Sequence, residues 1–158
     1  MQKDVYKGQV SIKTVSEYLY LGDSVRSDGS NKDNIKLRLN KGQGILRDIL
    51  QILEEVHLGS FFFEALKQLR NSMLISVLTY NLEVSHNLTK QDIKALEDLD
   101  LSLIRKALHL SAKSSHHLIY LETGLMSVEW IMKKKGLLYF HHLINSDDSS
   151  ISKKDTTC

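Results

Sequence analysis

The sequence predicts a mainly α-helical protein, an antiparallel helical bundle preceded by a short β-hairpin or small antiparallel sheet. The chain has 158 residues and no proline, so long helices can run without the break that proline imposes. Apolar residues recur every three or four positions from residue 30 onward, which is typical of amphipathic helices. Strand-like alternation and turn residues cluster before that point.

The first region, residues 1–29, carries the strand signals. A weak alternation of apolar and polar side chains predicts an edge strand over residues 5–12, with which residues 15–21 can pair as a hairpin. A third short strand at residues 24–26 is expected to end at the turn formed by Asp28-Gly29, since glycine adopts positive φ without steric cost.

The first helix is expected to begin after Ser30 or Asn31, with Asp33 in its first turn near the positive end of the helix dipole. Its apolar stripe keeps one seam toward a partner helix. The stripe consists of Ile35, Leu39, Gly42, Leu46, Ile49, Leu53 and Val56. Gly42 and Gly44 each weaken the helix by about 1 kcal/mol relative to alanine. Because Gly42 lies on the seam, we expect close packing there rather than a bend.

Two further helices follow with short connections. The second is expected to begin after Ser60 as N-cap and to end near Asn81, which tolerates a left-handed backbone. Its predicted apolar face is Phe62, Leu66, Leu69, Met73, Val77 and Tyr80. The third is expected to begin at Thr89, with Asp92 completing an approximate capping box. Its predicted core face is Ile93, Leu96, Leu99, Leu103, Ala107 and Leu110. Short connections predict that these three helices are antiparallel neighbours.

The helical region, residues 30–145, is expected to close with two more helices. A short one covers residues 116–121, and Gly124 separates it from a last helix that is capped by Ser127 and ends near residue 145. The tail, residues 146–158, is polar and lacks periodicity, so we expect it to be disordered.

Composition sets limits on function. A net charge of +2 is too small to indicate a nucleic-acid partner by itself, so any such argument depends on local clusters. The single cysteine, Cys158, leaves no internal disulfide possible and favours a reducing, intracellular compartment, with nucleus and cytoplasm left open. No apolar run has the length of a signal peptide or a membrane span, so no membrane partner is expected.

The strongest candidate site is a basic face on the first helix. Five cations, Lys32, Lys36, Arg38, Lys41 and Arg47, face two acidic residues over the same stretch. Such a cluster can hold phosphates, with each contact adding salt-dependent affinity. The alternative is an ordinary solvated helix face, which basic residues commonly form.

Metal binding and catalysis find little support. The pairs His116-His117 and His141-His142 are adjacent, and neighbouring helical side chains point about 100° apart, so neither pair can chelate one ion. Asp147-Asp148 lies in a polar tail rather than in the tight turn between apolar strands that metal-assisted phosphoryl transfer needs. We therefore predict no metal ligands, no cofactor site and no catalytic residues in this chain alone.

Several short motifs, taken in order, resemble one family. They are Tyr20-Leu21-Gly22, Asp28-Gly29, Ile35 with Arg38-Leu39, residues 78–83, Leu96-Glu97 with Ile104-Arg105, residues 119–124, and residues 134–143. Their order resembles the region after the catalytic palm in reverse transcriptases of non-LTR (LINE-type) retrotransposons. The chain departs from that pattern at Asn81, where glycine is usual, and at Ser127, where proline is common.

The resemblance implies the end of a palm followed by a thumb-like helical module. Such a module would bind the RNA or DNA backbone of a template–primer duplex without sequence preference, through the five cations of the first helix. The RNA-directed DNA polymerase activity of the family and its Mg²⁺ would belong to the palm, whose aspartates are expected before Met1. Further possible partners are a palm-containing polymerase segment and a second copy of the chain. The alternatives are a helical protein-interaction module and a retroelement relic without function.

Overall fold

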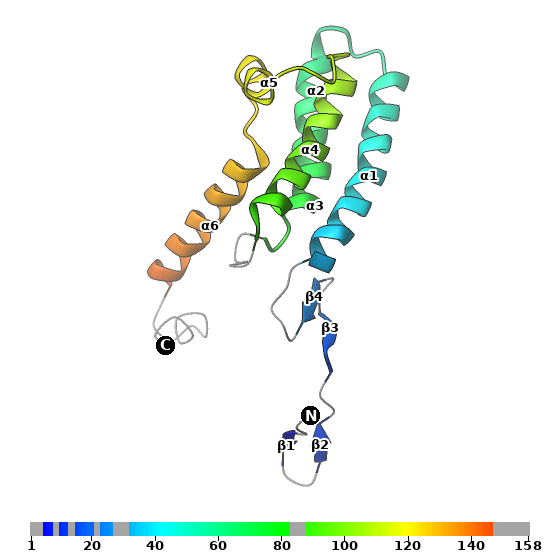
Figure 1. The fold of residues 1–158 in the computed structure, drawn as a ribbon. Helices are drawn as coiled ribbons and strands as arrows, with labels where there is room; N and C mark the ends of the chain where they lie inside the picture. Colours follow the sequence, from blue (N-terminus) through cyan, green and yellow to red (C-terminus); the bar gives the residue numbers. More distant parts are fainter. Residues whose placement is uncertain are drawn as a thin grey trace.

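The protein is mainly helical, as the sequence predicts (Figure 1). The computed structural model describes residues 5–7, 10–12, 15–20, 23–26, 32–82 and 88–146. The side chains that the structure describes as buried all belong to the helical region. The helices therefore hold the described core. The predicted tail, apart from Ser146, and the expected turn at Asp28-Gly29 lie outside the described residues.

The strands form two separate antiparallel pairs. Strand β1 (Val5–Lys7) pairs with β2 (Val10–Ile12), and β3 (Glu17–Tyr20) pairs with β4 (Asp23–Arg26). The expected pairing of residues 15–21 with the strand before them is therefore wrong. Each short strand pairs instead with its immediate neighbour in sequence, where loop closure costs the least entropy.

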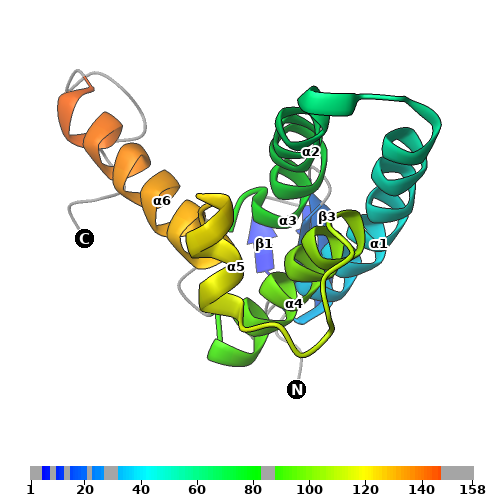
Figure 2. The same ribbon diagram turned by 90° about the horizontal axis from the view of Figure 1, so that it is seen from above.

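Three helical rods pack as an antiparallel bundle, which confirms the prediction (Figures 1 and 2). The first rod is α1 (Lys32–Glu55), and its expected caps at Ser30 or Asn31 lie outside the described residues. After the 3₁₀ turn η1 (Gly59–Phe61), the second rod joins α2 (Phe62–Leu69), the π-helical η2 (Arg70–Ile75) and α3 (Ser76–Thr79). The third rod is α4 (Lys90–Ala107).

The seam of α1 largely follows the prediction. Ile35, Leu46, Ile49 and Leu53 are buried against the other two rods, whereas Val56 is 48% exposed because the helix ends at Glu55. Close packing at Gly42 is confirmed, since its Cα faces side chains of Leu74, Leu78 and Leu99. These contacts bring α1 against both η2–α3 and α4.

The buried face of the second rod differs from the prediction after its first two turns. From there on, the buried positions are one residue later than predicted: Arg70, Leu74 and Leu78 in place of Leu69, Met73 and Val77. These positions follow Leu66 at intervals of four residues, and the wider turn of the π-helical segment from Arg70 onward keeps them on one side. Tyr80 is consequently 53% exposed.

The ends of the second rod give one wrong and one confirmed prediction. Ser60 is not a cap, because it lies inside η1 and α2 starts after Phe61 without a side-chain hydrogen bond. Asn81 adopts the expected left-handed backbone, with φ of 54°.

Local capping sets the remaining helix ends. The Thr89 hydroxyl accepts a hydrogen bond from the Asp92 backbone N–H at 3.1 Å, and the Asp92 carboxylate accepts one from the Thr89 N–H at 3.0 Å, which confirms the capping box. Helix α5 (His116–Thr123) runs two residues further than predicted and ends at Gly124, whose φ is 63°. Helix α6 (Val128–Asn145) begins, as predicted, after Ser127, whose hydroxyl accepts from the Trp130 N–H.

A left-handed residue also closes α4. His109 has φ of 52°, and the Leu110 N–H donates to the Arg105 carbonyl at 2.8 Å across this turn. We expect His109→Gly to stabilise the protein by about 1 kcal/mol, because glycine avoids the Cβ clash of this conformation. Thermal unfolding followed by circular dichroism measures the effect. His109→Ala keeps the Cβ and serves as control; equal melting temperatures for the two variants would contradict the expectation.

Candidate functional site

Arg38, one of the five predicted phosphate-binding residues, is buried. Its side chain is 5% exposed, its guanidinium donates to the Val77 carbonyl at 3.3 Å, and it lies over the Tyr80 ring at 5.4 Å from the centroid. A guanidinium held in this way cannot reach a nucleic-acid backbone. The burial of Arg38 therefore argues against a phosphate contact, and its side chain joins α1 to the end of the second rod.

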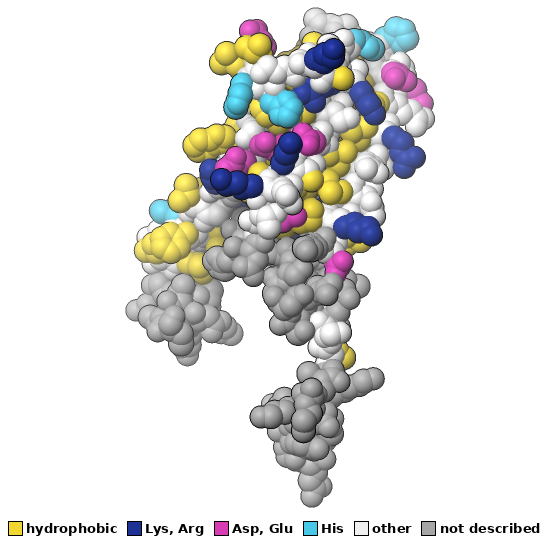
Figure 3. Space-filling model, in the orientation of Figure 1, with side chains coloured by type: hydrophobic (Ala, Val, Ile, Leu, Met, Phe, Trp, Pro, Cys, Tyr) yellow, Lys and Arg dark blue, Asp and Glu magenta, His cyan; other side chains and the backbone are white. Residues whose placement is uncertain are grey.

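Lys36, Lys41 and Arg47 are exposed on α1, while the side chain of Lys32 lies outside the described residues. At 100° per residue, Lys41 points about 140° away from Lys36. Arg47 points within about 20° of Lys36 but lies about 16 Å further along the helix. On the face shown in Figure 3, Lys and Arg side chains likewise alternate with acidic and apolar ones. The cations of α1 therefore form separate contact points and not one compact face.

A groove between η2 and α6 brings together lysines that the sequence did not associate. Its volume is about 430 Å³, and Lys67, Lys134 and Lys135 line it together with apolar residues such as Ile131 and Leu138. Lys135 Nζ donates to the Thr79 hydroxyl at 2.8 Å, which fixes that side chain beside the groove. This second cationic surface arises from helices far apart in the sequence, so spacing alone does not indicate it.

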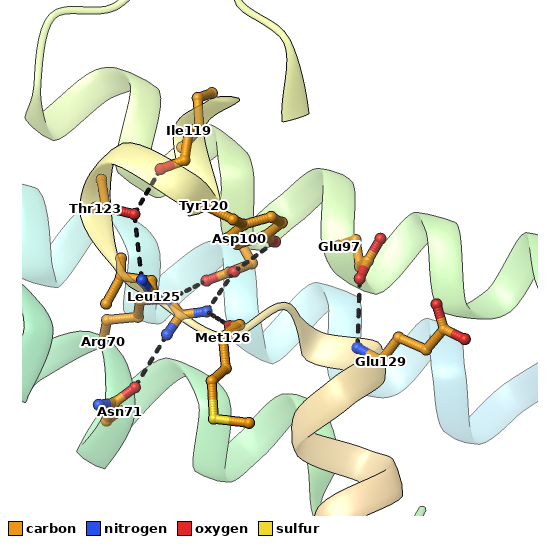
Figure 4. A network of polar contacts seen from close by, with 10 residues as sticks. All are labelled: Arg70, Asn71, Glu97, Asp100, Ile119, Tyr120, Thr123, Leu125, Met126 and Glu129. Atoms are coloured by element: carbon orange, nitrogen blue, oxygen red, sulfur yellow. Dashed lines mark hydrogen bonds and ion pairs between the residues drawn. The ribbon is translucent and has the colours of Figure 1, made fainter. Parts of the chain in front are cut away.

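Among the charged side chains that the structure describes, the two most deeply buried form an ion pair between η2 and α4. Arg70 and Asp100 have side-chain exposures of 1% and 0% (Figure 4). Arg70 Nε donates to Asp100 Oδ1 and Nη2 donates to Oδ2, both at 2.7 Å. This bidentate geometry is the strongest form of a charge-assisted hydrogen bond between these groups.

The ion pair extends to the connection between α5 and α6. Arg70 Nη2 also donates to the Met126 carbonyl at 2.7 Å, and the Tyr120 hydroxyl donates to Asp100 Oδ2 at 3.1 Å. Asn71 accepts a further bond from Arg70 Nη1 at 3.0 Å. The network thereby fastens α5 and the start of α6 to the bundle.

Sequence patterning contained a signal for both halves of this pair. Asp100 lies four residues after Leu96 and three before Leu103, so it falls on the core stripe of α4. A carboxylate on such a stripe indicates a buried partner. Arg70 carries a similar signal, because it lies four residues after Leu66 and four before Leu74, both of which are buried.

Burial raises the pKa of Tyr120 well above its ordinary value, and the nearby charges of Asp100 and Glu97 raise it further. Above about pH 10 the unfolded chain loses this proton while the folded chain keeps it, so stability falls as pH rises. We expect Tyr120→Phe to reduce this alkaline loss. Urea unfolding at about pH 8 and about pH 11 measures it. If wild type and variant lose stability in parallel, Tyr120 does not titrate as proposed.

The described residues offer no assembled metal site. No group of three or more His, Cys, Asp or Glu side chains lies close enough to hold an ion in the part of the chain that the structure describes.

The chain matches no family model, no curated protein and no solved structure. Among the described residues, no helix has the length and apolar character needed to cross a bilayer. The features that bear on function are therefore the exposed cations of α1, the groove lysines and the scaffold that holds them.

Proposed function

We propose that this chain is a thumb-like module of a non-LTR retrotransposon reverse transcriptase that binds the backbone of a template–primer duplex without sequence preference. The observation that carries the proposal is the exposure of Lys36, Lys41 and Arg47 on the first rod of an antiparallel bundle. None of the three forms an ion pair with another described residue. They are therefore available to phosphates.

The scaffold supports this proposal through its rigidity. Close packing at Gly42 and the buried Arg70–Asp100 pair fix the three rods relative to one another. Binding to phosphates depends on cations held at fixed spacing, since phosphate contacts set register and orientation without reading sequence. The groove lysines Lys67, Lys134 and Lys135 supply further contacts of the same chemistry.

Salt-dependent binding tests the proposal. Fluorescence anisotropy with a labelled RNA–DNA duplex should give an affinity that falls as salt increases, with a log–log slope of about −1 for each phosphate contacted. Removing all three α1 cations by alanine substitution should flatten the slope, whereas Lys113→Ala, at an exposed lysine in the loop after α4, should leave it unchanged. Affinity that is independent of salt, or equal for both variants, would overturn the proposal.

A second candidate function, a helical protein-interaction module, is favoured by one observation. Large apolar side chains are exposed on α5 and α6, among them Leu118, Leu121, Trp130, Leu137 and Phe140. Exposed apolar surface of this kind is typical of interaction sites. Sedimentation of the purified chain, alone and with duplex, separates this function from backbone binding, because apolar association does not weaken as salt increases.

A further inference from the structure

The groove between η2 and α6 has an aliphatic lining. Its volume of about 430 Å³ falls within the roughly 300–1,000 Å³ of small-molecule sites. The described apolar side chains that line it are Ile75, Leu125, Met126, Ile131 and Leu138. Ile75 and Leu125 are buried, whereas Leu138 is exposed by 59%. The groove therefore combines buried and accessible apolar surface, and a hydrocarbon segment that covers the accessible part removes it from water.

Cationic side chains stand among these apolar ones on both walls of the groove. On α6, Ile131, Lys134, Lys135 and Leu138 occupy positions i, i+3, i+4 and i+7, so they share one face of the helix. Lys67 lines the groove from the second rod. The described lining contains no Asp or Glu. Its charge is therefore of one sign.

Lys135 carries a charge that no described carboxylate neutralises. Its Nζ donates to the Thr79 hydroxyl at 2.8 Å, and that hydroxyl donates in turn to the Ile75 carbonyl at 2.8 Å. An ammonium group has three N–H donors, so two of them remain available to a ligand. The half-buried position of Lys135 makes an anionic acceptor favourable there, because a charge that is partly removed from water gains more from a partner.

The other cations of the groove differ in how far they are neutralised. Arg70 also lines the groove, but its charge is taken up by Asp100 (Figure 4). Lys67 meets Glu64 at 3.9 Å with both side chains exposed, a pairing that contributes little. Lys134 forms no ion pair with another described residue. The groove consequently has a positive potential that favours an anion.

The type of apolar lining favours an alkyl chain over a nucleobase. Bases are commonly bound by stacking on aromatic side chains, and no aromatic residue belongs to the described lining. We propose that the groove binds an amphiphile that has one anionic head group, a carboxylate or a phosphate, on an alkyl chain. The head group contacts Lys134 and Lys135, and the chain lies along the aliphatic lining. This ligand goes beyond the proposed duplex binding, which rests on the exposed cations of α1.

Isothermal titration calorimetry of the full chain tests the class of ligand. The probes are dodecanoate, dodecyl phosphate and dodecyltrimethylammonium, each below the concentration at which it forms micelles. We expect at least one of the two anions to bind about tenfold or more tightly than the cation, the change that one charge-assisted hydrogen bond gives. The stronger of the two anions identifies the preferred head group. Adenosine monophosphate, which has a phosphate without an alkyl chain, should bind about tenfold more weakly than that anion. Equal binding of the cationic probe, equal binding of adenosine monophosphate, or no binding of either alkyl anion would overturn the proposal.

Two matched pairs of variants test the position of the site. Lys134→Gln/Lys135→Gln should weaken binding of the preferred anion about tenfold or more. Lys90→Gln/Lys94→Gln, at exposed positions of α4, changes the net charge equally and should leave the affinity unchanged.

Leu138→Gln should likewise weaken binding, whereas Leu137→Gln, next to it but outside the groove lining, should not. Circular dichroism verifies that all variants keep the helicity of the wild type. Groove variants that bind like their controls would refute this position. No probe contains a duplex, so a failure here is distinguishable from a failure of the proposed duplex binding.

Discussion

Asp100→Ala is expected to destabilise the protein by about 3–5 kcal/mol, the cost of leaving one partner of a buried ion pair without the other. The guanidinium of Arg70 would stay buried after losing both of its 2.7 Å bonds to the carboxylate. The Tyr120 hydroxyl would lose its acceptor at the same time. Urea unfolding followed by circular dichroism measures the change in the free energy of unfolding.

Two further variants make this expectation specific. Arg70→Met/Asp100→Leu removes both charges and keeps apolar volume, so it should recover most of the loss. Lys133→Ala breaks an ion pair of the same 2.7 Å length whose side chains are 57% and 44% exposed, and it should cost less than about 1 kcal/mol. If Asp100→Ala were no more costly than Lys133→Ala, the network would not be what fastens α5 and α6 to the bundle.

Three helix ends were predictable because they depend on groups within a few residues of each other, whereas the predicted cap at Ser60 was wrong. The capping box of Thr89 and Asp92, the cap at Ser127 and the left-handed Gly124 are all local hydrogen-bond or backbone preferences. The seam of α1 was predictable for a related reason. Apolar residues that recur every three or four positions fall on one side of a helix whatever that side contacts. These features need no knowledge of the partner helices.

The candidate site was harder to predict because tertiary neighbours decide it. Arg38 is a cation of the same helix as Lys36 and Lys41, yet it lies beside the core stripe, three residues after Ile35, and donates a hydrogen bond to the Val77 carbonyl, 39 residues away. Arg70 lies on the row of Leu66 and Leu74, but only the packed structure shows that Asp100 of another helix pairs with it. The groove lysines come from α2 and α6, which only the packed structure brings together.

Gly42→Leu is expected to lower the free energy of unfolding by about 3 kcal/mol or more, because it forces a side chain into a filled core. A Cβ at this position would already lie 2.7 Å from Leu99 Cδ2 and 3.0 Å from Leu78 Cδ2. The fully buried Leu78 has no space into which to withdraw. Urea unfolding measures the change in the free energy of unfolding. A smaller slope of this free energy against urea concentration would indicate a less compact bundle.

Gly44→Leu is the matched control, two residues away on the same helix. No atom lies within 4 Å of a Cβ built at Gly44, so the substitution adds helix propensity without a clash and should stabilise the protein by about 0.5–1 kcal/mol. The same substitution is therefore expected to lower the free energy of unfolding at Gly42 and to raise it at Gly44. A smaller probe combines Gly42→Ala with Leu99→Ala. The double variant should cost less than the sum of the single variants, because the space left by the Leu99 side chain accommodates the new methyl group at residue 42. Additive costs would mean that α1 and α4 do not meet at Gly42.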